Sequence, residues 1–170
     1  MHGGRKILRI AAVYCVACVL ASCHKYQTPS STLPANDPAS ASQWLTGAYP
    51  PETPQWRWLA RNFSVALKPP DNTGPNGARL TVHLYVPDVV IRSVGPITLH
   101  AAAGWETLGS ETFTNPGTFD FMRDISPNLL NTNILPLEFC FDKAMPPSAA
   151  DGRELAAIVT SIDLKAALKP

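Results

Sequence analysis

The sequence predicts an all-β protein: a single antiparallel β-sandwich of jelly-roll type, preceded by a signal peptide and a disordered N-terminal tether. Three observations lead to this prediction. Short runs of β-branched, aromatic and other apolar residues alternate with polar residues, as in half-buried strands. Turn-forming Pro, Gly, Asn and Asp residues separate these runs at intervals of roughly 10–15 residues. The first part of the chain holds a short apolar run and then a Pro- and Ser-rich stretch with too few apolar residues for a core.

The first 22 residues have the three parts of a secretory signal peptide. Arg5, Lys6 and Arg9 form a basic start, and an uncharged, mostly apolar run follows over residues 10–23. This run is shorter than the roughly 20 apolar residues that a membrane-spanning helix needs. Removal of residues 1–22 leaves 148 residues, enough for one domain and a tether, and changes the formal net charge from +1 to −2.

Two of the three cysteines in this region, Cys15 and Cys18, have the C-x-x-C spacing of zinc and redox sites. They lie inside the signal peptide, where no folded domain surrounds them. Metal and redox chemistry needs thiolates in a polar, folded setting. The pair is therefore expected to have no role in the mature protein.

The third cysteine ends the stretch Leu20-Ala21-Ser22-Cys23, which resembles the lipobox of bacterial lipoproteins. The resemblance implies that Cys23 receives a diacylglyceryl group and becomes the first residue after cleavage. Two acyl chains on one residue suffice for stable binding to membrane lipid. His24 follows in place of an inner-membrane retention aspartate, so the expected location is the outer membrane or the cell surface.

The mature chain divides into two parts by composition. Residues 23–43 are rich in Pro, Ser, Thr and Ala and are interpreted as a lipidated tether that holds the domain off the bilayer. Residues 44–170 are interpreted as the β-sandwich domain.

Strands are expected in the order 59–67, 79–86, 97–101, 105–114, 119–123, 135–141 and 158–164. The clearest alternation places Leu80, Val82, Leu84 and Val86 on one face of the second run. Residues 97–101 and 105–114 are expected to form a hairpin, since Ala-Ala-Gly separates them. The last segment, 154–168, also fits a helical stripe, but its β-branched residues favour a strand.

The order of these elements is similar to small jelly-roll modules found beside bacterial glycosyltransferases and in other bacterial surface proteins. The likeness rests on Trp56-Arg57-Trp58 near the start, the alternating strands, and the charged segment 151–154 before residues 158–162. It implies a non-catalytic sandwich with carbohydrate as the candidate ligand.

The motifs of common enzyme classes are absent from the sequence. It contains neither G-x-S-x-G nor H-E-x-x-H. His83 and His100 lie in the middle of strands without metal-ligand spacing, so both are interpreted as structural. Cys140 has no basic neighbour and is expected to be a buried, inert thiol. We therefore expect no catalytic residue, cofactor or metal, and the near-neutral charge argues against nucleic acid as a partner.

Four aromatic residues are candidates for ligand binding: Trp105, Trp56, Trp58 and Tyr85. Sugar-binding sandwiches present aromatic rings to the C–H faces of pyranoses, with a few polar groups for orientation. Trp105 follows Gly104 in a turn and is the best candidate for an exposed ring. Trp56 and Trp58 are expected on the same face of a strand, either as a platform or, more simply, as core packing.

A charged cluster, Asp151-Gly-Arg153-Glu154, precedes the last strand. The terminal strands of a jelly roll can be neighbours. Arg57 is therefore expected to pair with Asp151 or Glu154 and to fix the closure of the sandwich, a structural role rather than ligand binding.

Together these features predict a lipid-anchored envelope lipoprotein. Its sandwich is expected to act as a non-catalytic binding module, with glycan as the favoured ligand. The alternative is a structural or assembly subunit that docks a protein partner in the cell envelope.

Overall fold

The computed structural model of the chain describes residues 28–53, 55–71 and 73–167. The predicted signal peptide 1–22 and Cys23 lie outside these residues. The elements in chain order are β1 (Thr32–Pro34), η1 (Pro38–Gln43), β2 (Trp44–Ala48), β3 (Arg57–Leu67), η2 (Gly74–Asn76), β4 (Ala78–Val86), α1 (Asp88–Val94), β5 (Ile97–Ala103), β6 (Glu106–Phe113), β7 (Gly117–Ile125), η3 (Pro127–Leu130), β8 (Leu135–Phe141) and β9 (Ala157–Ala166). Within these ranges, none of the helices has the length and apolar character of a membrane-spanning segment.

Four antiparallel strand pairs are nested along the chain, and they confirm the predicted jelly-roll sandwich. The innermost pair is β5 with β6, followed by β4 with β7 and β3 with β8, and the outermost is β1 with β9. In such a nest each strand in the first half of the chain finds its partner in the second half. The first and last strands consequently meet.

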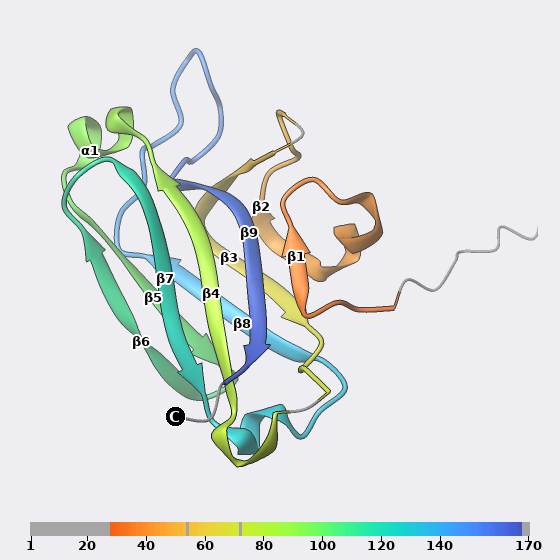
Figure 1. The fold of residues 1–170 in the computed structure, drawn as a ribbon. Helices are drawn as coiled ribbons and strands as arrows, with labels where there is room; N and C mark the ends of the chain where they lie inside the picture. The colour runs from red at the N-terminus through yellow and green to blue at the C-terminus, as the bar shows by residue number, and fades with distance from the viewer. Residues whose placement is uncertain (1–27, 54, 72, 168–170) are drawn as a thin grey trace, which may run out of the picture.

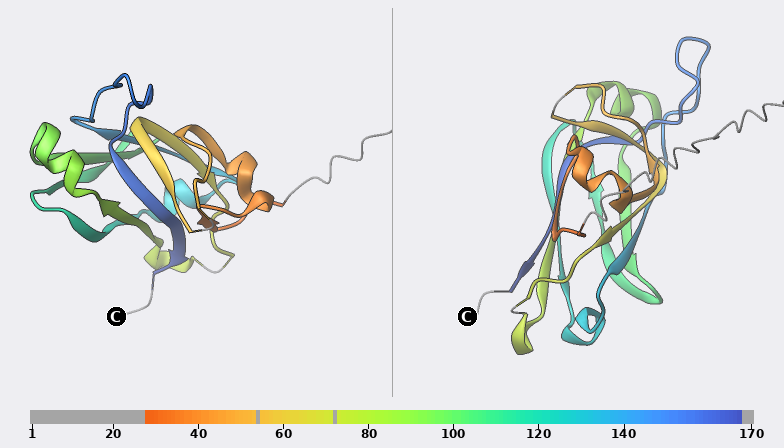
Figure 2. Two further views of the ribbon diagram at one scale, coloured as in Figure 1. Left: turned by 90° about the horizontal axis from the view of Figure 1, so that it is seen from above. Right: turned by 90° about the vertical axis from the view of Figure 1, so that its right-hand side faces the viewer.

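Two sheets face each other across the molecule (Figures 1 and 2). One sheet has the order β6-β5-β8-β3-β2, and the other has the order β7-β4-β9-β1. β3 joins them, because its first residues, 57–59, pair with β9 and its later residues, 62–67, pair with β8. We call them the β8 sheet and the β4 sheet.

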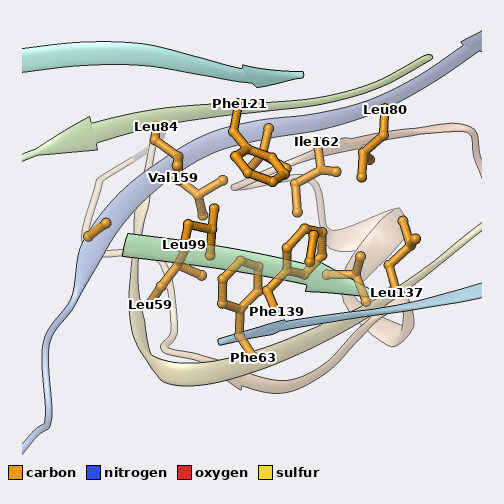
Figure 3. Packing of buried hydrophobic residues seen from close by; sticks show 14 of the residues in the cluster. Leu59, Phe63, Leu80, Leu84, Leu99, Phe121, Leu137, Phe139, Val159 and Ile162 are labelled. Carbon is orange, nitrogen blue, oxygen red and sulfur yellow. The ribbon is translucent and has the colours of Figure 1, made fainter. Parts of the chain in front are cut away.

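The core fills the space between the sheets (Figure 3). Phe63 of β3 stacks on Phe139 of β8, with ring centroids 4.5 Å apart and planes only 5° from parallel. Opposite them lies the β4 sheet, whose residues Leu80, Val82, Leu84 and Val86 are all buried, as their alternation predicts. Every second residue of each central strand therefore contributes to one shared apolar layer.

The predicted boundary between tether and domain lies too far along the chain. β1 pairs with β9 through Leu33 and Ile162, and both side chains are buried. Gln43, at the end of η1, is also buried and donates to the carbonyl oxygens of Ser30 and Ala66. A three-residue strand with one inward apolar side chain is too short to show alternation, so composition alone indicated a tether.

The last segment is a strand, β9, as its β-branched residues predict. Helix α1, which begins at Asp88 and ends at Val94, was not predicted from the sequence. It is flanked by Pro87 and Gly95. Asp88 and Arg92 form an ion pair of 2.6 Å on its exposed side, one turn apart. Only Val90 of this short helix is buried, so its sequence has little of the periodicity by which longer helices are found.

The first testable prediction concerns β1. Leu33→Ala should reduce the free energy of unfolding by about 2 kcal/mol or more, because it leaves a cavity beneath a fully buried side chain. Urea denaturation would measure this change. Leu45→Ala is the control, since Leu45 is 49% exposed and its truncation should have little effect. Equal stability of the two variants would show that β1 is not part of the folded domain.

Candidate functional site

Trp105 lies in the tight turn between β5 and β6. The ribbon places this turn at the end of the sandwich opposite α1 (Figure 1). Gly104 takes the first turn position with φ 59°, a left-handed conformation that favours glycine in hairpin turns. The turn leaves Trp105 95% exposed. A fully exposed tryptophan is unusual, because burial of its large apolar ring stabilises a folded protein. Trp105 is therefore the strongest ligand-binding candidate among the aromatic residues.

A pocket with a volume of about 320 Å³ lies beside Trp105. Its apolar wall comes from Leu129, Leu135, Pro136 and Ile134, the last of which is 42% exposed. Its walls belong to the end of β5, the β5–β6 turn, and the chain from η3 to the start of β8. We call this hollow the Trp105 pocket.

Three neutral polar residues, Asn128, Asn131 and Thr132, complete the lining of the Trp105 pocket. The Asn128 carboxamide oxygen accepts a hydrogen bond from Ser126 Oγ, and Thr132 Oγ1 donates to the carbonyl oxygen of Ile134. Within the part of the chain that the structure describes, the Asn131 side chain has no hydrogen-bond partner. The pocket thus combines an aromatic ring, an apolar wall and amide and hydroxyl groups without a formal charge, as small-molecule sites commonly do.

The other three aromatic candidates lie elsewhere. Trp56 and Trp58 contact each other edge to face, with ring centroids 6.4 Å apart, and both are half-buried. Trp58 packs against the edge of the core, so the pair is not a freely exposed platform. Tyr85 is 41% exposed on the β4 sheet. The structure therefore does not bring these rings together with Trp105 into one site.

Arg57 does not form the predicted ion pair with Asp151 or Glu154. The side chain of Arg57 points inward, and its Nε donates to the carbonyl oxygen of Ala35 at 2.6 Å. Its guanidinium also lies 4.4 Å from the ring centroid of Trp44. Burial lowers the pKa of Arg57 below its usual value. Arg57 does help to fix the closure, but it binds the backbone that follows β1.

The carboxylates of the charged cluster have other partners. Arg153 forms ion pairs with Asp151 at 2.7 Å and with Glu52 at 2.5 Å. Glu154 accepts a hydrogen bond from the backbone N–H of Arg61. This network connects the loop before β9 to the loop before β3. Arg153, rather than Arg57, is the arginine that pairs with Asp151, and Glu52 is a further partner that its sequence position did not indicate.

His83 has two carboxylate partners that the sequence analysis missed. Its Nδ1 lies 2.6 Å from Asp120 Oδ1, and its Nε2 lies 3.1 Å from Asp163 Oδ2. Thr32 of β1 donates to the other oxygen of Asp163. These residues come from four neighbouring strands, so only the strand register brings them together. No group of three or more His, Cys, Asp and Glu side chains suited to a metal ion is present in the described ranges.

Comparison with known proteins gives structural neighbours only. No family model matches the sequence, and no curated protein is significantly similar to it. The C-terminal CBM6 of LamC, a marine laminarinase from Zobellia galactanivorans, has a TM-score of 0.44 and 8% identity over 79% of this chain and 97% of that chain. The CBM36-1 domain of a multidomain xylanase from the hindgut metagenome of Trinervitermes trinervoides has a TM-score of 0.38 and 11% identity, over 64% of this chain and 73% of that one.

A third similar structure is dimeric latent PorU from Porphyromonas gingivalis, with a TM-score of 0.42 and 14% identity. The similarity covers 79% of this chain but only 12% of PorU. The neighbours thus include carbohydrate-binding modules with β-sandwich folds. With TM-scores below 0.5, the similarity is limited to general architecture, and the function is inferred below from the residues of this chain.

The second testable prediction concerns the pH dependence of the Arg153 network. Hydrogen bonds from Arg153 lower the pKa of the Asp151 carboxyl to about 2. Because this value lies below the ordinary pKa of about 3.9, the contribution of the pair to stability is fully present above pH ~4 and is lost as the pH falls through about 2. A carbon-detected NMR titration should give an Asp151 midpoint near pH 2, and Arg153→Gln should raise it toward the ordinary value.

Arg92→Gln is the matched control for this titration, because it removes an arginine from an exposed ion pair on α1. It should leave the Asp151 midpoint unchanged. A wild-type midpoint near pH 4 would contradict the prediction.

Proposed function

We propose that this protein is a non-catalytic glycan-binding module that uses the Trp105 pocket. The observation that carries the proposal is the Trp105 ring, fully exposed beside a hollow of about 320 Å³. The tight hairpin keeps the Trp105 ring exposed to water, so burial in the core of its own domain does not stabilise this ring. A ligand with an apolar face would cover it.

The polar groups of the Trp105 pocket favour a neutral sugar as that ligand. A pyranose ring has an apolar C–H face that can stack on indole, while its hydroxyl groups need donors and acceptors around its edge. Asn131 offers both, and Asn128 and Thr132 lie in the same lining. No charged residue lines the pocket, so a strongly charged ligand would lose its hydration without gaining an ion pair.

We further propose that the module is anchored to a membrane through acylated Cys23 and faces the cell envelope. The support is the sequence alone: a basic start, a short apolar run, and Leu20-Ala21-Ser22-Cys23 directly after it. Since β1 begins at Thr32, the chain between Cys23 and the domain spans at most about 30 Å when fully extended. The module would then bind ligands close to the membrane surface.

The third testable prediction concerns ligand recognition. A glycan array probed with the full chain, carrying Cys23→Ser to prevent acylation, should identify neutral pyranose oligosaccharides as ligands. Trp105→Ala should weaken their binding about 5- to 100-fold, since stacking of a nucleobase on an aromatic ring contributes about 1–3 kcal/mol and a sugar face on indole should contribute a similar amount. The melting temperature of the Trp105→Ala variant should equal that of the parent chain, because the Trp105 ring is 95% exposed.

Tyr85→Ala is the matched control, since it removes an exposed ring from the β4 sheet, away from the Trp105 pocket. It should retain full glycan binding. Absence of glycan binding, or binding that Trp105→Ala leaves intact, would contradict the proposal. Capture of an envelope protein by the same chain in a Trp105-dependent manner would favour the alternative function as an assembly subunit.

The fourth testable prediction concerns the anchor. Cys23→Ser should abolish labelling by a fatty-acid analogue and release the protein from membranes. Cys18→Ser is the control, because the neighbouring cysteine lies within the predicted signal peptide, and this variant should remain labelled and membrane-bound. Continued labelling of Cys23→Ser would show that the lipobox interpretation is wrong.

A further inference from the structure

A second hollow, of about 350 Å³, lies on the outward face of the β8 sheet. The side chains that matter for its chemistry are Asn62, Ser64, His100, Ala102, Glu138 and Cys140. They come from three neighbouring strands, β3, β8 and β5. We call this hollow the sheet trough.

The strand register builds the sheet trough from two rows of side chains. In one row, Cys140 of β8 lies between His100 of β5 and Asn62 of β3. In the next row, Glu138 lies between Ala102 and Ser64. The two short side chains beside Glu138 leave the space that larger residues would fill. Cys140 points to this outward face and is half-buried there, so the expectation of a buried thiol is wrong.

Three polar side chains of the sheet trough have no partner among the described residues, whereas Ser64 Oγ hydrogen-bonds Thr46 Oγ1 and Cys140 Sγ donates to the carbonyl oxygen of Phe141. Among residues 28–53, 55–71 and 73–167, no side-chain hydrogen bond or ion pair involves Asn62, His100 or Glu138. All three are exposed, and all three line the same hollow. They provide an amide, an imidazole and a carboxylate, which between them can donate to and accept from hydroxyl groups.

The outward face of the β4 sheet differs in this respect. There the charged side chains pair with one another: Arg79 with Asp124 at 2.9 Å, and His83 with both Asp120 and Asp163. That face thus pairs these charged groups with one another. Unpaired polar side chains gathered around a hollow therefore distinguish the sheet trough from the corresponding surface on the other side of the molecule.

The sheet trough and the Trp105 pocket have neighbouring lining residues along β8. Pro136 lines the Trp105 pocket and shares the outward face of β8 with Glu138, two residues further on. Ala102 lines the trough, and the next residue, Ala103, lines the pocket. From Pro136 to Cys140 the strand rises about 13 Å, at 3.3 Å per residue. A ligand that follows the outward face of β8 would therefore pass continuously from one hollow to the other.

From this continuity we infer that the protein binds a neutral oligosaccharide chain rather than a single sugar. One end of the chain stacks on Trp105, and the following units lie along β8, where Asn62, His100 and Glu138 hydrogen-bond their hydroxyl groups. The Glu138 carboxylate accepts from hydroxyls and repels uronic-acid or sialic-acid units, so acidic glycans are disfavoured. This inference rests on the proposed function of the Trp105 pocket and extends it.

The experiment compares short and long probes by isothermal titration calorimetry. The probes are the disaccharide and the hexasaccharide of β-linked glucose, xylose, mannose and galactose series, titrated into the full chain carrying Cys23→Ser. For at least one series, the hexasaccharide should bind about tenfold more tightly than the disaccharide, the gain expected from two or three additional hydrogen bonds.

Ala102→Ile should remove this length dependence by filling the sheet trough, while leaving disaccharide binding unchanged. The residue is half-buried on a strand, so a β-branched replacement is compatible with the fold. Thr118→Ile places the same side chain at an exposed position of β7 in the β4 sheet and is the matched control. Glu138→Gln should retain hexasaccharide binding and admit acidic hexasaccharides that the wild type rejects.

The outcomes separate the two proposals. Equal affinity for both lengths, lost in Trp105→Ala, would overturn the extended site and leave the proposed function intact. Length dependence that survives Ala102→Ile would also overturn the extended site. Failure of every probe to bind the full chain that carries only Cys23→Ser would overturn both the extended site and the proposed function.

Discussion

The packing of the two inward sheet faces against each other is the constraint on which the rest of this structure depends. Phe63 and Phe139 stack at 4.5 Å on one side, and the leucine and valine residues of β4 meet them from the other. Because side chains alternate along a strand, every residue committed to this layer places its neighbour on the outside. The core therefore determines which residues form the outward faces and which turns lie at the ends.

The closure of the sandwich follows from the same constraint. β9 lies beside β4 along most of its length and pairs with β3 and β1 on its other side. Arg57 reaches from β3 to the backbone carbonyl of Ala35, just after β1. The chain that follows the predicted lipid anchor is therefore attached to the edge of the β4 sheet, through β9. If the protein is anchored as proposed, this attachment would limit how far the domain can move from the membrane.

The outward faces of the two sheets differ in how their polar side chains are paired. On the β4 sheet, charged side chains of neighbouring strands form ion pairs with one another. On the β8 sheet, short side chains beside Glu138 create a hollow, and its Asn62, His100 and Glu138 side chains have no partners in the described chain. The Trp105 turn lies at the end of that second sheet. The proposed binding residues thus lie on one sheet and at one end of the sandwich.

The all-β class, the inward residues of the long strands and the exposure of Trp105 could be predicted from the sequence alone. These features are local, since alternation and a Gly-containing turn act over a few residues. The folded chain was needed to show that Leu33 belongs to the core, that Arg57 binds Ala35 rather than Asp151, and that His83 contacts Asp120 and Asp163. The sheet trough likewise exists only through the register of β3, β8 and β5. Each of these contacts joins residues far apart in the chain, and pairing between distant strands leaves no signal in a single sequence.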